Sequence, residues 1–184
     1  MKKPATGRSR LPSALDAVRL AVSADPFWAE RLSGLTRVAA VEFSVHLAVC
    51  VEPFLGYILD GSKTVESRFS VNRCAPFGRV GQGDAVLLKR TGGPVVGLAH
   101  VRAVWSYHLD ESSWRCIREQ FTEALRAQDP GFWHSRREAV YATLMSIDHV
   151  VALEPIAWKK RDRRGWVVVQ RTRQPLLFGG DDEH

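Results

Sequence analysis

Cysteine is scarce in this chain of 184 residues, which holds only three, and they lie far apart. No CxxC pair occurs, so neither a zinc ribbon nor a dithiol redox motif is supported, and we expect reduced thiols in a cytoplasmic protein. The histidines show no HExxH pattern, so no metal site is predicted. Fingerprints of the GxxxxGK(S/T) and GxGxxG types are also missing, and we therefore expect no cofactor.

Long apolar runs are missing as well. No stretch approaches the roughly 20 residues that a membrane span needs, and the basic start of the chain lacks the apolar core of a signal peptide. The composition, with 45% hydrophobic and 25% charged residues, is instead that of an ordinary soluble globule. A chain of this length predicts one domain with an appendage, with no need for disulfides or a metal to fold.

Positive charge is in excess and unevenly placed. The net charge is +6, and residues 1–40 contribute +4, residues 159–173 contribute +6, and the tail 181–183 contributes −3. Two basic blocks of this kind indicate contact with a polyanion. The alternative is that they are solvated segments that only keep the protein soluble.

The first 40 residues read as a basic, partly helical N-terminal extension. Ser13 can cap one short helix, and Asp25-Pro26 can begin another, with Asp as the cap and Pro in the first turn. A compact domain is expected over 41–178, followed by an acidic tail at 179–184.

Strands dominate the compact domain. The expected strands span 43–51, 63–69, 85–90, 95–107, 147–158 and 166–170, with a bulge or bend at Gly97. The expected helices span 53–60 and 111–127, with a further helix from Pro130 that carries Phe132, Trp133, Val140, Tyr141 and Leu144. This order predicts an α+β fold, a small and mostly antiparallel β-barrel with peripheral helices.

The segment 61–68, Gly-Ser-Lys-Thr-Val-Glu-Ser-Arg, carries the most chemical information. Two residues apart in a strand, Glu66 and Arg68 face the same side, and Lys63 lies at the helix–strand junction. Charges in a half-buried strand need partners. One interpretation is a structural Glu66–Arg68 ion pair that pins the loop; the other is a polar pocket for a small hydrogen-bonding group.

The same segment resembles the ASCH domain family of PUA-like β-barrels. The family pattern is a strand and short helix, then G-x-K-T-x-E-x-R, then a Gly-Asp turn with a strand, here at 46–54, 61–68 and 83–89. The resemblance covers about residues 44–170. It implies a barrel with a cleft beside G-x-K-T-x-E-x-R, and relatives that bind RNA or modified nucleobases.

Some relatives are hydrolases. The similar bacterial amidohydrolases that deacylate N4-acetylcytidine use the lysine of G-x-K-T, which matches Lys63, and a threonine at the position of Glu66 here; other relatives are metal-dependent ribonucleases. Glu66 beside Lys63 favours a charged binding lysine over a neutral base. Its carboxylate can accept hydrogen bonds from an exocyclic amine, as carboxylates do with cytosine N4. The pattern therefore favours binding over hydrolysis.

Aromatic and basic residues outside the segment point the same way. Trp105 and Tyr107 end the long strand, and rings of this kind stack on unpaired bases. Trp158 and Trp166 flank the basic run, which suits a phosphate backbone; alternatively they anchor a hairpin in the core. The candidate binding residues are Lys63, Thr64, Glu66, Arg68, Trp105, Tyr107, Lys159, Lys160, Arg161, Arg163 and Arg164.

Three functions follow as hypotheses. The first is binding of RNA, single-stranded nucleic acid or a modified nucleobase, with no membrane partner. The second is hydrolysis of an acylated nucleoside or of RNA, with Lys63 and Glu66 as the catalytic groups. The third is a protein-interaction module that uses helices at 13–33 and 111–145 and exposes a large apolar patch on them.

Overall fold

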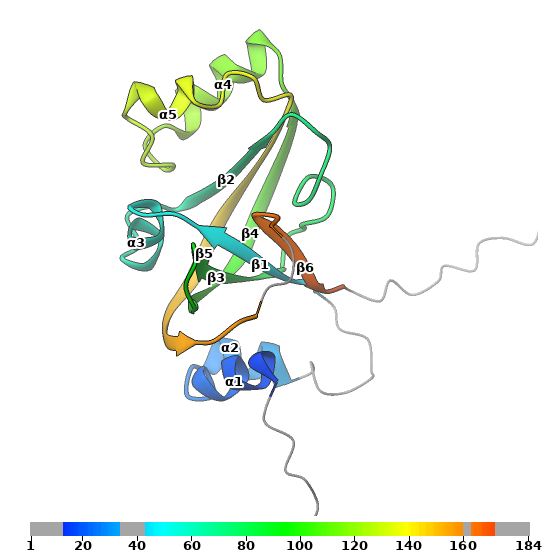
Figure 1. The fold of residues 1–184 in the computed structure, drawn as a ribbon, viewed down its shortest axis with the longest axis vertical. Coiled ribbons are helices and arrows are strands. Elements are labelled where there is room, and N and C mark those ends of the chain that lie inside the picture. The colour runs from blue at the N-terminus through cyan, green and yellow to red at the C-terminus, as the bar shows by residue number, and fades with distance from the viewer. Residues whose placement is uncertain (1–12, 34–42, 160–162, 172–184) are drawn as a thin grey trace, which may run out of the picture.

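The fold is built on one curled sheet (Figure 1). A computed structural model describes residues 13–33, 43–159 and 163–171. The six strands have the order β2-β5-β4-β3-β1-β6 and curve into a half-barrel. The strands are β1 (Val45–Cys50), β2 (Val65–Ser70), β3 (Ala85–Arg90), β4 (Val95–His108), β5 (Tyr141–Ile156) and β6 (Trp166–Gln170). The helices are α1 (Ala14–Ala21), α2 (Pro26–Ser33), α3 (Phe54–Leu59), α4 (Glu111–Phe121) and α5 (Pro130–His134).

The expected α+β architecture, a small and mostly antiparallel curled sheet with peripheral helices, is confirmed. Four of the strand pairings are antiparallel, and β1 and β3 pair in parallel. A parallel pair needs a crossover, which α3 and β2 supply here. The β4–β5 register shifts between Val95 and Gly97, where a bulge or bend was expected, and bulges of this kind bend a strand.

The expected helix from Pro130 through Leu144 is wrong. Helix α5 ends at His134, and β5 begins at Tyr141, so Val140 lies outside the helix and both Tyr141 and Leu144 lie in the strand. Helix α4 also ends early, at Phe121 rather than at Ala127. Tyr141 and Leu144 suit a helical spacing in the sequence, but the long pairing of β5 with β2 and β4 determines their conformation.

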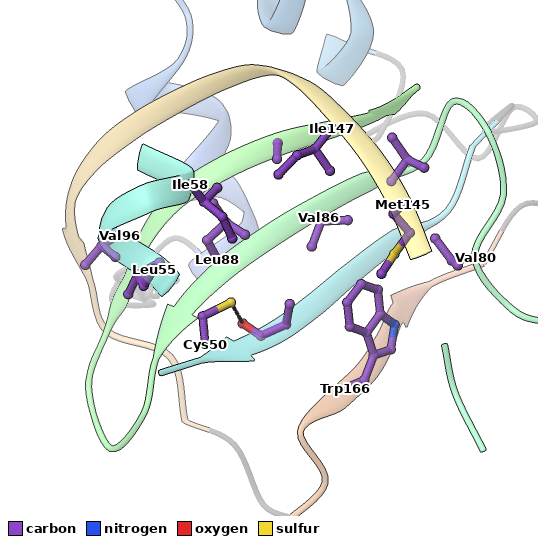
Figure 2. Packing of buried hydrophobic residues seen from close by; sticks show 13 residues of the cluster. Cys50, Leu55, Ile58, Val80, Val86, Leu88, Val96, Met145, Ile147 and Trp166 are labelled. Atoms are coloured by element: carbon purple, nitrogen blue, oxygen red, sulfur yellow. Dashed lines mark hydrogen bonds between the residues drawn. The ribbon is translucent and has the colours of Figure 1, made fainter. Parts of the chain in front are cut away.

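Both faces of the sheet are covered. In β3, Ala85 and Leu87 pack toward α1 and α2, whereas Val86 and Leu88 pack into the hollow of the curl with α3 (Figure 2). This is the two-residue alternation of a strand, and an apolar residue is required at each position because both sides are buried. A third cluster lies between the sheet and helices α4 and α5.

The two N-terminal helices begin as expected. The Ser13 hydroxyl accepts from the Asp16 amide in a capping box, and Asp25 accepts from the Trp28 amide at 3.0 Å. Val18 and Trp28 are fully buried against the sheet. The described residues do not include 1–12, 34–42 or 172–184. The expected acidic tail at 179–184 falls in the last of these ranges.

Across the described ranges, no helix is long and apolar enough to cross a membrane.

Candidate nucleobase-binding site

Strand β2 and the turn before it position the three charged residues of the 61–68 segment. Glu66 and Arg68 are two residues apart in β2, so their side chains leave the same face. Lys63 precedes the strand, where its amide donates to the Tyr57 carbonyl oxygen at 2.8 Å. That bond holds the turn after α3 and directs the Lys63 side chain back toward Glu66.

The three groups form a buried charged triad. The Glu66 carboxylate lies between the two cations, with Oε2 at 3.2 Å from Lys63 Nζ and Oε1 at 3.0 Å from Arg68 Nε. The side chains of Lys63 and Glu66 are 3% and 10% exposed. Lys63 Nζ also donates to the Val65 carbonyl oxygen. The predicted Glu66–Arg68 ion pair is therefore present, and Lys63 joins it.

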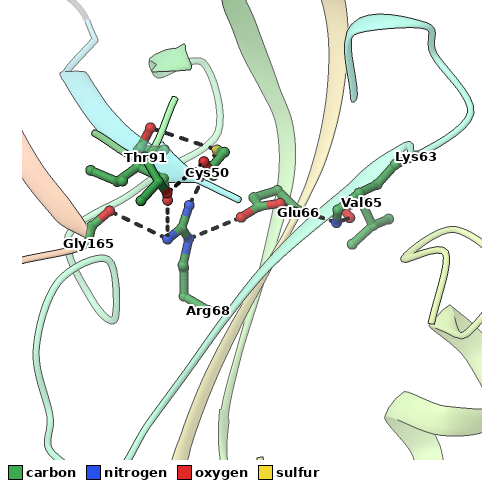
Figure 3. Close-up of polar contacts among 9 residues, drawn as sticks. Cys50, Lys63, Val65, Glu66, Arg68, Thr91 and Gly165 are labelled. Atoms are coloured by element: carbon green, nitrogen blue, oxygen red, sulfur yellow. Dashed lines mark hydrogen bonds and ion pairs between the residues drawn. The ribbon is translucent and has the colours of Figure 1, made fainter. Parts of the chain in front are cut away.

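Arg68 also links the two edges of the sheet (Figure 3). From edge strand β2 its Nη1 donates to the Val49 carbonyl oxygen of β1 at 3.0 Å and to the Gly165 carbonyl oxygen beside β6 at 3.4 Å. Its guanidinium lies over the ring of Trp166, 5.3 Å from the centroid. The arginine thus fastens the open side of the half-barrel.

The Trp166 side chain is held by hydrogen bonds that run to two buried residues, His46 and then Asp84. Its indole Nε1 donates to His46 Nδ1 at 3.1 Å, and His46 Nε2 lies 2.9 Å from Asp84 Oδ2. Because Nδ1 accepts, Nε2 carries the ring proton and donates to Asp84. Asp84 also accepts from the backbone amides of Ser44 and Gly81, so a chain of hydrogen bonds supports the surface on which Arg68 rests.

A cavity of about 220 Å³ opens beside the triad. Its lining combines the triad with aromatic rings and a further arginine, and it includes Phe54, Lys63, Glu66, Arg68, Phe69, Phe132 and Arg136. This volume lies below the roughly 300 Å³ at which pockets for drug-sized ligands begin. The cavity therefore suits a group of the size of a nucleobase.

The charges in this cavity influence one another. Burial raises the pKa of Glu66, but the charges of Lys63 and Arg68 and the hydrogen bonds to the carboxylate outweigh burial, and the pKa is lowered from its ordinary value. The pKa of Arg136 is lowered from its ordinary value, because burial and the nearby Arg68 charge lower it by more than the Glu66 charge raises it. Glu66 is therefore an ionised acceptor among three cations.

Cys50 also lines the cavity, and its thiol is unreactive. Burial, followed by the negative charge of Glu66, raises the pKa of Cys50 to about 12. Its Sγ lies 3.6 Å from Arg68 Nη2 and serves as a packing atom. All three cysteines are free thiols, of which Cys74 is exposed.

Other predicted site residues lie elsewhere. The Thr64 side chain is exposed, and its amide donates to the Ala124 carbonyl oxygen. Trp105 and Tyr107 pack in the cluster under α4, where the Trp105 ring centroid lies 5.0 Å from that of Phe121, and neither lines the cavity. Lys159, Arg163 and Arg164 are exposed, whereas Lys160 and Arg161 lie outside the described residues.

The aromatic wall of the cavity was missed by sequence reasoning. Phe54 comes from α3, Phe69 from β2 and Phe132 from α5. Arg136 follows Phe132 by four residues, with its guanidinium carbon 3.7 Å from the ring centroid. No spacing rule joins three separate segments, although Phe132 and Arg136 could have been paired as neighbours at helical spacing. Within the described ranges, no group of three or more potential metal ligands comes together.

Comparison with solved structures identifies the fold. An ASCH protein from Zymomonas mobilis superposes with a TM-score of 0.56 at 12% identity, covering 69% of this chain and 88% of that one. The protein has the ASCH fold. A point mutant of the same Zymomonas mobilis protein gives a TM-score of 0.54 at 14% identity. No family model matches the sequence, and no curated protein matches it. The ASCH fold expected from the 61–68 segment is thus confirmed from the structure.

Proposed function

We propose that this protein binds RNA, another single-stranded nucleic acid or a modified nucleobase, by admitting one base into the triad cavity. The observation that carries the proposal is the buried ionised carboxylate of Glu66, held between Lys63 and Arg68 on the wall of a base-sized cavity. Burying charges costs free energy, and here they lie beside an opening and not in a sealed core.

The cavity offers each kind of contact that an unpaired base uses. Glu66 provides a charged acceptor for an exocyclic amine such as cytosine N4. Lys63 has a third N–H beyond those directed to Glu66 and Val65, and this can donate to a base carbonyl. The rings of Phe54, Phe69 and Phe132 line the cavity, and contact of a base with a ring is worth roughly 1–3 kcal/mol. One face of Phe69 is already stacked on Trp114, and Arg136 lies over Phe132.

The charge balance of the cavity favours a nucleotide over a neutral molecule. Lys63, Arg68 and Arg136 face the single carboxylate of Glu66 among the lining residues that the structure describes. Excess positive charge in a recess attracts an anion. A phosphate attached to the bound base supplies that charge.

Binding of nucleosides and of a short single-stranded RNA tests the proposal. In Arg136→Gln we expect the affinity for the RNA to fall on the order of tenfold, because a charged hydrogen bond to a phosphate contributes about 1.5–3 kcal/mol, whereas the affinity for a nucleoside should change little. The control is Arg137→Gln, since Arg137 is exposed and pairs with Glu138 outside the cavity. Equal RNA affinities in the two variants, measured by titration calorimetry on folded protein, contradict the proposal.

A hydrolase is the second candidate, and the position of Lys63 Nζ on the cavity wall supports it. This hypothesis predicts turnover of N4-acetylcytidine that is lost in Lys63→Ala. The assay is release of acetate followed by chromatography. A clean preparation that turns over no acylated nucleoside and cleaves no RNA removes this candidate.

A further inference from the structure

A second and larger hollow is lined in part by Trp166, whose ring contacts Arg68 of the triad. Its volume is about 820 Å³, and it is formed by the loop between β2 and β3 together with β6 and the residues beside it. Four arginines line it, namely Arg73, Arg79, Arg164 and Arg171. We refer to it as the arginine groove.

The charged side chains in the described lining of the arginine groove are all positive. No carboxylate belongs to the described lining, which otherwise consists of apolar side chains, Cys74 and Gly78. Like charges gathered around one hollow repel one another, although Arg73 also lies over the ring of Phe77 at 5.5 Å. A ligand that carries several negative charges relieves this repulsion.

The groove and the triad cavity are linked by residues in contact. Trp166 lines the groove, and Arg68, which lines the cavity, lies over the ring of Trp166 at 5.3 Å. Arg68 also donates to the carbonyl oxygen of Gly165, between Arg164 and Trp166 (Figure 3). A chain that places a base beside Arg68 therefore has its neighbouring phosphates within reach of the groove.

We infer that the arginine groove binds the phosphodiester backbone of a single-stranded nucleic acid whose base occupies the triad cavity. This inference rests on the proposed function and adds a second site to it. Arginine suits phosphate because its planar fork donates in pairs. Arg73 and Arg79 come from the loop, and Arg171 comes from the end of β6, so the phosphates are gripped from two sides.

The test uses an oligouridylate and an oligothymidylate of about 12 nucleotides, a length within the range of single-strand sites. Their bases lack an exocyclic amine, and the N3–H of the Watson–Crick edge is the donor that they offer to Glu66. The double variant Arg73→Gln/Arg79→Gln is compared with Arg102→Gln/Arg115→Gln, which removes the same charge from exposed positions outside the groove. We expect the groove variant to lose affinity on the order of tenfold, and the slope of log affinity against log salt to fall by about 1.4. In the control variant, the affinity and the salt slope should both stay within about twofold of the values of the natural protein.

The two oligonucleotides distinguish a site for any phosphodiester backbone from a site for RNA alone. Loss of affinity for both in the groove variant supports a site for phosphodiesters in general, and loss for the oligouridylate alone supports an RNA site. Equal losses in the groove and control variants overturn the inference, because the charge of the molecule and not the groove is then responsible.

Cys74 supplies an independent readout. It is exposed and lines the groove, whereas Cys116 lies outside and Cys50 is buried. A bound oligouridylate should slow alkylation of Cys74 by a neutral maleimide at least severalfold and leave Cys116 unchanged. Unprotected Cys74 at saturating oligouridylate overturns the placement.

Free nucleosides distinguish this inference from the proposed function. The groove variant should bind a nucleoside as the natural protein does, because a nucleoside carries no phosphate. If no nucleoside binds to either protein while the groove variant alone loses oligouridylate, the triad cavity has failed and the groove stands. If nucleosides bind and the groove variant keeps its oligouridylate affinity, the groove has failed.

Discussion

Glu66 has a structural role, and the proposed function gives the same carboxylate a ligand. Its two carboxylate oxygens hold Lys63 and Arg68 in place, and lone pairs remain on both oxygens for a ligand. A carboxylate in this position must stay ionised, because its protonated form would leave two cations without a counter-charge.

Replacing Glu66 with Gln should destabilise the protein at neutral pH by roughly 3–5 kcal/mol, the usual cost of removing one partner from a buried ion pair. The stabilisation from the lowered pKa of Glu66 is complete above the ordinary value of 4.5 and is lost as pH falls through the folded-state pKa. The stability gap between the natural protein and Glu66→Gln should therefore narrow in acid.

Urea denaturation at a series of pH values measures this gap. The control is Glu138→Gln, because the Glu138 side chain is 79% exposed and its ion pair with Arg137 is solvated. A gap that stays constant between pH 7 and strong acid would show that the Glu66 charge does not stabilise the fold.

The triad could be predicted from the sequence, whereas the partners of Arg68 and the wall of the cavity could not. The spacing of Glu66 and Arg68 indicated one face of a strand, and a strand does hold both. The partners of Arg68 are backbone carbonyl oxygens of Val49 and Gly165, which no side-chain pattern encodes. Trp105 was expected at the cavity because it is a large ring on a long strand, yet that face of β4 packs under α4.

At the scale of elements, the end of α3 packs on β4 at Gly97. A Cβ atom at Gly97 would meet Leu59 Cδ2 at 2.7 Å and Leu88 Cδ1 at 3.2 Å. The glycine at the β4 bulge is therefore what admits the end of α3, and α3 in turn positions the turn that holds Lys63.

We expect Gly97→Ala to destabilise the protein by about 1–3 kcal/mol through overpacking. The second substitution Leu59→Ala removes the nearest clashing atom, so the double variant should recover part of the loss relative to the sum of the single variants. Chemical denaturation of all four proteins gives the coupling free energy. Simple additivity would mean that α3 does not press on Gly97.

The boundary between α5 and β5 shows where element prediction fails. Asp129-Pro130 is a strong helix start, and it is correct, since the Asp129 side chain accepts from Gly131 at 2.8 Å. A start signal does not set a length, however. The pairing of β5 with two neighbouring strands is a tertiary effect that local periodicity cannot show.

At the scale of the whole molecule, the N-terminal helices cover one face of the sheet. Trp28 is fully buried, and its Nε1 donates to the His149 carbonyl oxygen at 2.8 Å. Leu47, Leu87 and Leu98 of the sheet share the same cluster. A segment described from sequence as an extension thus completes a core.

Trp28→Ala should lower stability by about 3–5 kcal/mol, and the helices and sheet should still unfold in one transition. Helical circular dichroism and the fluorescence of the remaining tryptophans should give the same midpoint. Leu20→Ala is the control, since Leu20 is 76% exposed. Two separate midpoints would show that α1 and α2 form an independent appendage.

The described surface gives little support to a protein-interaction module on these helices. The large apolar residues that are exposed in the described ranges are Leu20, Val51 and Val71, which lie on three different segments. A docking patch needs contiguous apolar area. The interaction hypothesis therefore stays a prediction without a surface to support it.

The fastening of the two sheet edges by Arg68 has a consequence for genetics. A mutation of that residue loosens the fold as well as the candidate site, so cells would clear the altered protein before its affinity could matter. Screens that score survival or abundance would classify such alleles as loss of expression. Only purified protein, compared at equal folded concentration, separates the two defects.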